Sequence, residues 1–144
     1  MPDPRDAYDA ALREAVRHGL RSDGLPARAH AWATYWMAVW GWPEPARPDI
    51  TSGYRSPARQ RELLRRWAAG DRAGFIGRPA TRSWHTVRRA WDVQTRVRGY
   101  DVYEYLMRWL SEQPGVRIRV GVDFDDQGHF DAPTDTTPPS VYTL

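Results

Sequence analysis

Three short segments of the chain carry residues that could together bind a metal ion: Ser83-Trp84-His85, Ala90-Trp91-Asp92 and Asp126-Gln127-Gly128-His129-Phe130. The imidazoles of His85 and His129 and the carboxylate of Asp92 can hold zinc and leave its fourth position for water, which is the catalytic arrangement rather than the structural one. Asp126 lies three residues before His129 and could take a proton from that water. The set predicts hydrolytic chemistry.

The spacing of the first two candidate ligands limits how they can meet. His85 and Asp92 are seven residues apart, so on one continuous strand they would face opposite sides of the sheet. On one helix they would share a face but stand roughly 10 Å apart, too far for one ion. Both can reach one metal if residues 86–89 form a turn that sets two strand ends side by side. With His129 on a neighbouring strand, we expect three ligands from three sheet positions.

Each of these residues also has an ordinary interpretation. A lone histidine is more often hydrogen-bonded than metal-bound, and Asp92 could be a turn residue. The acids near the third segment could form a solvated loop: Asp123, Asp125 and Asp126. Asp131 could be a partner of a metal ligand or a surface acid. The conjunction of the three segments favours a metal site over these alternatives.

Arg55 follows Ser52-Gly53-Tyr54 at the start of a predicted helix. A cation at a helix start interacts mildly unfavourably with the helix dipole. This suggests that Arg55 has a function other than that of a charged surface residue. A guanidinium near zinc could hold a substrate carboxylate or stabilise an oxyanion as a carbonyl is attacked.

The composition is that of an ordinary globular domain. The chain has 144 residues, of which 41% are hydrophobic and 27% are charged. It has no cysteine, which excludes disulfides and thiolate metal ligands. A net charge of +3 favours an anionic partner such as nucleic acid or a bacterial wall polymer, but no nucleic-acid-binding signature accompanies it, so nucleic acid is not expected.

Neither a secretory signal nor a membrane span is expected. Met1 to Leu20 contains no apolar run, and the most apolar stretch, Ala29 to Trp42, is too short to cross a bilayer. We therefore expect a protein that is cytoplasmic at synthesis and that acts elsewhere only if released.

The order of predicted elements indicates an α+β fold: a small antiparallel sheet that carries the zinc site, flanked by helices, with an N-terminal helical hairpin. Helical or strand periodicity predicts these elements: helices over 6–20, 27–40, 57–70 and 101–112, and strands over 49–54, 90–95 and 116–122. We expect a single domain over 1–144, with an N-terminal helical part (1–42), a core (43–131) and an extended tail (132–144).

Capping residues and apolar stripes refine these helices. Ser56 is a good N-cap, and Asp101 is expected to cap the last helix. The apolar face of that helix is expected to be Val102, Tyr105, Leu106 and Trp109. The tryptophan-rich helix over 27–40 is apolar nearly all round and is interpreted as buried core rather than as a helix on a membrane surface.

The motifs resemble those of the VanY-like zinc peptidases, which comprise D-alanyl-D-alanine carboxypeptidases and dipeptidases and phage L-alanyl-D-glutamate endopeptidases. Ser52-Gly53-Tyr54-Arg55-Ser56 resembles their SGYRS motif. Ser83 to Asp92 resembles their second motif, Ser-x-His-x-x-Gly-x-Ala-x-Asp, and Asp126 to Phe130 the third, in a form closer to the phage endolysins. The resemblance covers Ser52 to about Asp131. It departs from the family at Arg88, which stands where the family has glycine.

The resemblance implies that His85, Asp92 and His129 bind zinc, that Asp126 is the catalytic base and that Arg55 contacts the substrate or the oxyanion. It also implies a Hedgehog-type fold with the zinc on the sheet. We assign two further motif residues to substrate binding: Ser83 and Tyr54. If the family glycine has positive φ, an arginine at that position costs energy or forces another turn.

The leading hypothesis is therefore a zinc-dependent peptidase that cuts a peptide bond in peptidoglycan stem peptides, as a carboxypeptidase or an endolysin-type endopeptidase. Two alternatives stay open. One is a non-catalytic zinc-containing module of the same fold that binds cell wall or a protein, for which Arg88 is the main support. The other is a basic nucleic-acid binder.

Overall fold

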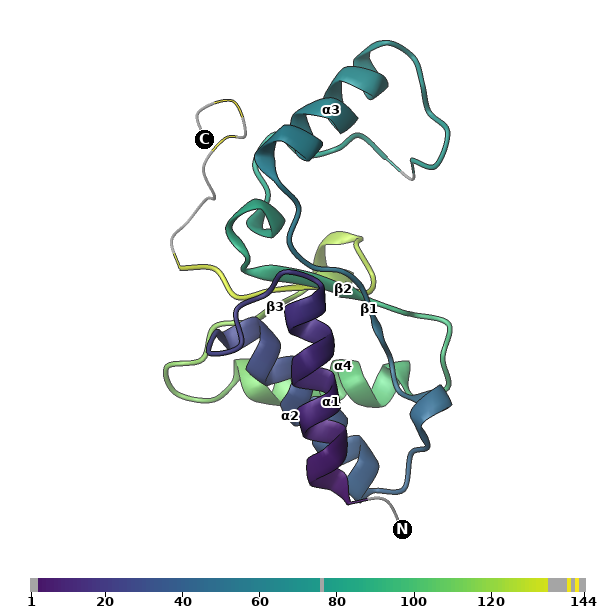
Figure 1. The fold of residues 1–144 in the computed structure, drawn as a ribbon, viewed down its shortest axis with the longest axis vertical. Coiled ribbons are helices and arrows are strands. Elements are labelled where there is room, and N and C mark those ends of the chain that lie inside the picture. Colours follow the sequence, from purple (N-terminus) through teal and green to yellow (C-terminus); the bar gives the residue numbers. More distant parts are fainter. Residues whose placement is uncertain (1–2, 76, 135–139, 141, 143–144) are drawn as a thin grey trace.

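The computed structural model describes residues 3–75, 77–134, 140 and 142 (Figure 1). Much of the extended tail predicted over 132–144 lies outside these residues. The elements follow one another in this order: α1 (Pro4–Arg17), α2 (Leu25–Val39), η1 (Glu44–Ala46), β1 (Ile50–Ser52), α3 (Pro57–Ala68), η2 (Trp84–Val87), β2 (Ala90–Val93), α4 (Tyr100–Ser111), β3 (Arg119–Val120), η3 (Gly121–Phe124) and β4 (His129–Asp131). The α-helices are labelled α, the short 3₁₀ helices η and the strands β.

The strands form one small antiparallel sheet in the order β1-β2-β4-β3, so the predicted α+β class is confirmed. The β2–β4 register places Asp92 directly opposite His129 and Ala90 opposite Asp131. The predicted strand over 116–122 is shorter than expected, because the chain enters η3 at Gly121. A Cβ at Gly121 would lie only 2.0 Å from the Asp126 carbonyl oxygen, so the backbones approach too closely there for any other residue.

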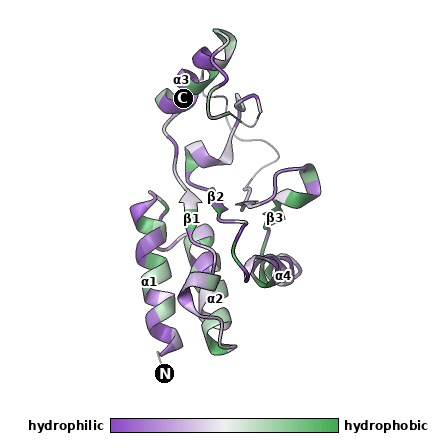
Figure 2. Cartoon of the chain, turned by 90° about the vertical axis from the view of Figure 1, so that its right-hand side faces the viewer, coloured by the Kyte–Doolittle hydropathy of each residue, from purple (hydrophilic) through white to green (hydrophobic). Residues whose placement is uncertain are grey.

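The helices lie on two sides of the sheet. In Figure 1, α1, α2 and α4 lie below it, and α3 with its following loop projects above it. Figure 2 shows α1 and α2 side by side, with α4 beneath β3. The lower helices share one hydrophobic core with all four strands, to which Met37, Trp91 and Phe130 contribute fully buried side chains. The N-terminal helical hairpin therefore supports the sheet from below.

Helix α3 begins as the sequence predicts, with the Ser56 hydroxyl accepting a hydrogen bond from the Arg59 N–H at 3.0 Å. The prediction for α4 is wrong in two respects. Gly99 is its N-cap, and Asp101 lies in the first turn. The buried face is Tyr100, Tyr103, Leu106 and Met107, whereas Tyr105 is 62% and Trp109 45% exposed.

Hydrogen bonds in the core explain which face of α4 is buried. The hydroxyl of Tyr103 accepts a hydrogen bond from Trp91 Nε1 at 2.7 Å and contacts His30 Nδ1 at 2.8 Å. The other ring nitrogen of His30 lies 2.7 Å from a carboxylate oxygen of Glu14. A network that joins α1, α2, α4 and β2 thus fixes the rotation of the helix, because each of its buried polar groups needs a partner.

The tryptophan-rich helix is only partly core. The buried side of α2 is formed mainly by small residues and Met37, while Trp32 and Trp36 are partly buried and Trp40 is 52% exposed. Small residues on the inner side let the helix pack closely, which leaves the large rings at the edges. None of the helices in the described part of the chain has the length and apolar character needed to cross a bilayer.

Candidate metal centre

His85 lies in the 3₁₀ helix η2, so the expectation of three ligands on three strand positions is wrong for this residue. The Ser83 hydroxyl caps η2 by accepting a hydrogen bond from the His85 backbone N–H at 3.2 Å. The buried His85 ring has its Nδ1 2.7 Å from the Gly53 carbonyl oxygen. Because a carbonyl can only accept, Nδ1 donates to it, and Nε2 faces Asp92 Oδ1 at 3.4 Å.

Asp92 and His129 lie opposite each other on β2 and β4, as neighbouring strands predict. His129 Nδ1 is 3.0 Å from Asp92 Oδ1, and its Nε2 is 2.8 Å from a carboxylate oxygen of Asp131. The structure therefore brings the three predicted ligands together, with one nitrogen of each ring directed at Asp92.

This geometry fits a metal ion. One potential ligand atom from each of His85, Asp92 and His129 lies within 4.8 Å of the other two. Ligand atoms of tetrahedral zinc stand roughly 3.3 Å apart, given bonds of about 2.0–2.1 Å. The outer nitrogen of each ring already has an acceptor, the Gly53 carbonyl for one and the Asp131 carboxylate for the other. Such partners are usual for metal-binding histidines because they fix the tautomer and the ring orientation.

The electrostatics of the cluster favour a positive charge. Burial alone would raise the pKa of Asp92, but hydrogen bonds with His129 and His85 outweigh it and hold this pKa well below its usual value. Burial alone would lower the pKa of His129, but hydrogen bonds with Asp131 and Asp92 raise it to about 9. The carboxylates thus favour a cationic charge at this point, as they would favour a divalent ion.

Asp126 lies at the solvent side of the cluster. Its carboxylate is 61% exposed, and one oxygen lies 3.7 Å from His129 Nδ1. A tight turn places it there: the His129 N–H donates to the Asp126 carbonyl at 3.1 Å, and Gly128 has φ +91°. An exposed carboxylate at this position can exchange protons with water bound at the cluster.

Arg55 is joined to the same region through its backbone, whose N–H donates to the His85 carbonyl at 3.1 Å. Its guanidinium donates to the amide oxygen of Gln60 at 2.9 Å. Gln60 is itself buried and donates to the Ala80 carbonyl at 2.7 Å. The arginine is thus anchored at the start of α3. Tyr54 precedes it, and its ring lies against the Arg88 guanidinium, 3.8 Å from the guanidinium carbon to the ring centroid.

Asp131 was left open by the sequence, and the structure places it beside His129, two residues further along β4. Its side chain is fully buried, and Arg119 donates two hydrogen bonds of 2.7 Å to its carboxylate. Arg119 lies opposite Asp131 in the β3–β4 register. The sequence shows Arg119 within an alternating strand, but only the register of β3 and β4 shows that it pairs with Asp131.

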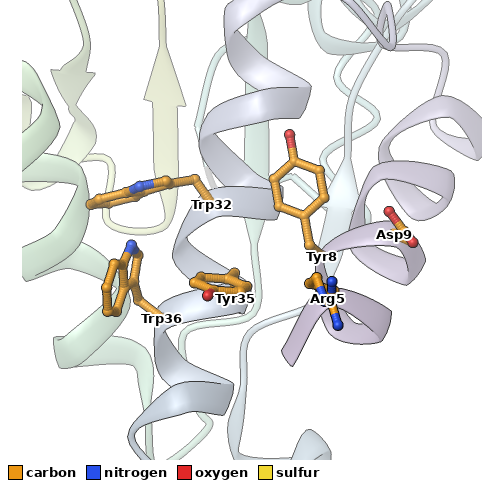
Figure 3. Close-up of a pocket in the computed structure, with 6 residues that line it drawn as sticks. All are labelled: Arg5, Tyr8, Asp9, Trp32, Tyr35 and Trp36. Atoms are coloured by element: carbon orange, nitrogen blue, oxygen red, sulfur yellow. The ribbon is translucent and has the colours of Figure 1, made fainter. Parts of the chain in front are cut away.

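A separate concave surface lies between α1 and α2 and does not include the cluster. In Figure 3, the Tyr8 ring of α1 lies beside the aromatic rings of α2, and Asp9 lies farther from them on α1. Its lining residues are Arg5, Tyr8, Asp9, Trp32, Tyr35 and Trp36. It belongs to the helical hairpin, on the far side of the sheet from α3 (Figure 1).

The sequence matches no protein-family model and no curated protein. Among solved structures, the crystal structure of the Serratia marcescens L-Ala D-Glu endopeptidase ChiX is similar, with a TM-score of 0.56 and 21% sequence identity. The alignment covers 88% of this chain and 86% of that one. The chain has the fold of this endopeptidase.

Proposed function

We propose that this protein is a zinc-dependent peptidase that hydrolyses a peptide bond in the stem peptides of bacterial peptidoglycan. The observation that carries the proposal is the convergence of His85, Asp92 and His129, each ring bonded through its outer nitrogen to an acceptor. The fold shared with a structure described as an L-Ala D-Glu endopeptidase supports the substrate class. The proposal also takes the chain to form a single domain, because α1 and α2 share a core with the sheet.

The chain supplies the groups that such a reaction needs. His85, Asp92 and His129 would hold the zinc, which when bound supplies a Lewis acid and an acidified water. Asp126, exposed beside His129, would accept the proton of the attacking water and return it to the leaving amine. Arg55 would bind a substrate carboxylate or the developing oxyanion, exchanging its contact with Gln60 for one with the substrate. Tyr54, next to Arg55, and Ser83, the N-cap of η2, would line the peptide site.

Purified cell-wall sacculi test the proposal directly. Turbidity should fall with the wild-type protein and zinc, and should not fall when a chelator is present. Equal turbidity loss with and without chelator would contradict zinc dependence. Zinc binding without hydrolysis of sacculi or of isolated stem peptides would instead favour the non-catalytic binding module.

The role of Asp126 is tested by the matched pair Asp126→Asn and Asp125→Asn. Both changes remove one exposed carboxylate from the same loop, and asparagine tolerates the positive φ of +61° at residue 125. Asp126→Asn should lower hydrolysis about 10²–10⁴-fold while zinc stays bound, since an amide cannot accept the proton. Asp125→Asn should remain active. Loss of zinc from the Asp126 variant would show that Asp126 is a ligand and not a base.

A further inference from the structure

Arg88 has a backbone conformation that side chains other than glycine rarely adopt. It ends η2 with φ +63° and ψ +30°, in the left-handed region. Arginine is strained there, because its Cβ crowds the backbone. Residue 88 therefore keeps the turn that a glycine would favour. Contacts of the Arg88 side chain must offset the backbone strain.

The side chain of Arg88 makes two such contacts, both with segments remote in the sequence. Its guanidinium lies over the Tyr54 ring, 3.8 Å from the guanidinium carbon to the ring centroid. One of its nitrogens also donates a hydrogen bond to the carbonyl of Gly19, in the turn between α1 and α2. Arg88 thus joins η2, the Tyr54 loop and the helical hairpin.

The same three segments also meet through their backbones. The Tyr54 N–H donates to the His18 carbonyl at 2.7 Å. A Cβ at Gly53 would lie 2.5 Å from that carbonyl oxygen, and a Cβ at Gly19 would lie 2.7 Å from the Tyr54 Cβ. The hairpin turn and the Tyr54 loop are therefore packed at backbone distance, and neither glycine can be replaced without moving the other segment.

This contact leads directly to the metal centre. The Gly53 carbonyl, one residue before Tyr54, accepts the hydrogen bond from His85 Nδ1. It thereby fixes the tautomer of His85 and turns Nε2 toward Asp92. His85 and Arg88 belong to the same turn, η2 and its C-cap. The path from Arg88 through Tyr54 and Gly53 returns to His85 and closes a ring of contacts.

We propose that Arg88 is a positioning residue for the metal centre: by holding the Tyr54 loop between η2 and the hairpin turn, it keeps the Gly53 carbonyl in place to orient His85. This inference rests on the proposed zinc site. It assigns the N-terminal hairpin a direct part in supporting the metal ligand, through His18 and Gly19.

Arg88→Gly separates positioning from simple stability. Glycine adopts the left-handed conformation without strain, which offsets the loss of the two side-chain contacts, so global stability should stay near the wild-type value. If Arg88 positions His85, the dissociation constant for zinc should nevertheless rise about 10-fold, at the low end of effects seen for partners of metal ligands. Arg88→Lys should recover part of the affinity, because an ammonium group can still lie over Tyr54 and reach the Gly19 carbonyl.

Amide hydrogen exchange of the metal-free protein gives a second readout that does not depend on zinc or activity. In Arg88→Gly, the Tyr54 amide should exchange about 5–10-fold faster than in the wild type, since local opening of the loop becomes easier. Arg72→Gly is the matched control, because its guanidinium also lies over an aromatic ring, Trp67, at 3.6 Å, but outside the site. It should change neither quantity.

The outcomes distinguish this inference from the proposed function. Unchanged zinc affinity and unchanged Tyr54 exchange in Arg88→Gly would overturn the positioning role, and so would the failure of the wild type to bind zinc. A wild type that binds zinc but hydrolyses no wall peptide would overturn the proposed function alone. Weaker zinc binding in Arg88→Gly with recovery in Arg88→Lys would support the positioning role in either case.

Discussion

Replacing Asp131 by asparagine tests whether His129 depends on a buried carboxylate. The Asp131 carboxylate is fully buried and receives three hydrogen bonds, two from Arg119 at 2.7 Å and one from His129 Nε2 at 2.8 Å. Asparagine has nearly the same shape but presents one oxygen and one NH₂ group. In Asp131→Asn at least one of these donors must therefore face another donor.

The expected magnitudes follow from these contacts. Removing one partner of a buried ion pair costs about 3–5 kcal/mol. Arg119 is 47% exposed and can be rehydrated, so we expect a smaller loss, about 2–3 kcal/mol in the free energy of unfolding. The zinc dissociation constant should rise about 10–100-fold, because the His129 ring loses the acceptor that orients it.

Two measurements check these values. Urea unfolding followed by tryptophan fluorescence, with chelator present, gives the stability of the metal-free protein. Competition with a chromogenic chelator, under conditions where the variant is folded, gives the zinc affinity. Asp123→Asn is the control, since it also breaks a double hydrogen bond with an arginine, Arg108, but at an exposed site. It should leave both quantities near the wild-type values.

A folded Asp131→Asn variant that binds zinc within about threefold of the wild type would refute the reasoning. In that case Arg119 and Asp131 would be a pair that stabilises the sheet without orienting the metal ligand.

Two further predictions concern the network of Glu14, His30 and Tyr103 and the exposed Asp49 beside it. Partial burial, and after it the nearby Glu14 carboxylate, raises the pKa of Asp49 above its ordinary 3.8. Protonation of Asp49 therefore stabilises the fold at pH values below 3.8, and this stabilisation is lost as the pH rises through the pKa of the folded protein. The difference in unfolding free energy between Asp49→Asn and the wild type, measured by urea titration, should therefore shift in favour of the variant from about pH 3 to about pH 7. An equal difference at both pH values would contradict this. Tyr103→Phe should lose about 1–3 kcal/mol of unfolding free energy, because Trp91 Nε1 and His30 Nδ1 lose their buried partner. The exposed Tyr105→Phe should lose almost nothing, and an equal loss from both would show that the network does not contribute.

Much of the site could be predicted from the sequence because its signals are local. Asp92 lies within a run typical of a strand, and Asp126 and His129 are held by a short turn. The N-cap at Ser56 is also a local pattern, and it places Arg55 at the helix start. Such features depend on a few neighbouring residues, which the sequence shows directly.

The position of His85 could not be predicted in this way. Alternation in Ser83-Trp84-His85 suggests a strand, but Ser83 instead caps a 3₁₀ helix. The turn predicted over 86–89 exists, yet it begins two residues earlier, at Trp84. Propensity was overridden because the His85 ring gains a buried hydrogen bond with Gly53, a contact 32 residues away.

The same limit applied to α4. An apolar stripe through Val102, Tyr105, Leu106 and Trp109 has correct helical spacing, but so has one through Tyr103, Leu106 and Met107. Tertiary hydrogen bonds select between them, since the Tyr103 hydroxyl must meet Trp91 and His30. A sequence pattern gives the period of a helix, and partners elsewhere in the chain set its rotation.

From the sequence, roles could be assigned to residues that could contact a metal or a substrate. The residues that hold those groups in place were visible there too, but their contacts were not. Gly53 and Asp131 fix the outer nitrogens of the two rings, and Arg88 and Gly19 fix Gly53 in turn. A rigid site requires both sets, because a histidine with two free nitrogens has no defined tautomer or orientation. Metal and substrate contacts can be inferred from residue type. The residues that orient the contacting groups use backbone carbonyls and strained turns, which any sequence could contain. In the proposed site, the N-terminal hairpin, which lies outside all three motifs, therefore supports a candidate ligand without supplying one.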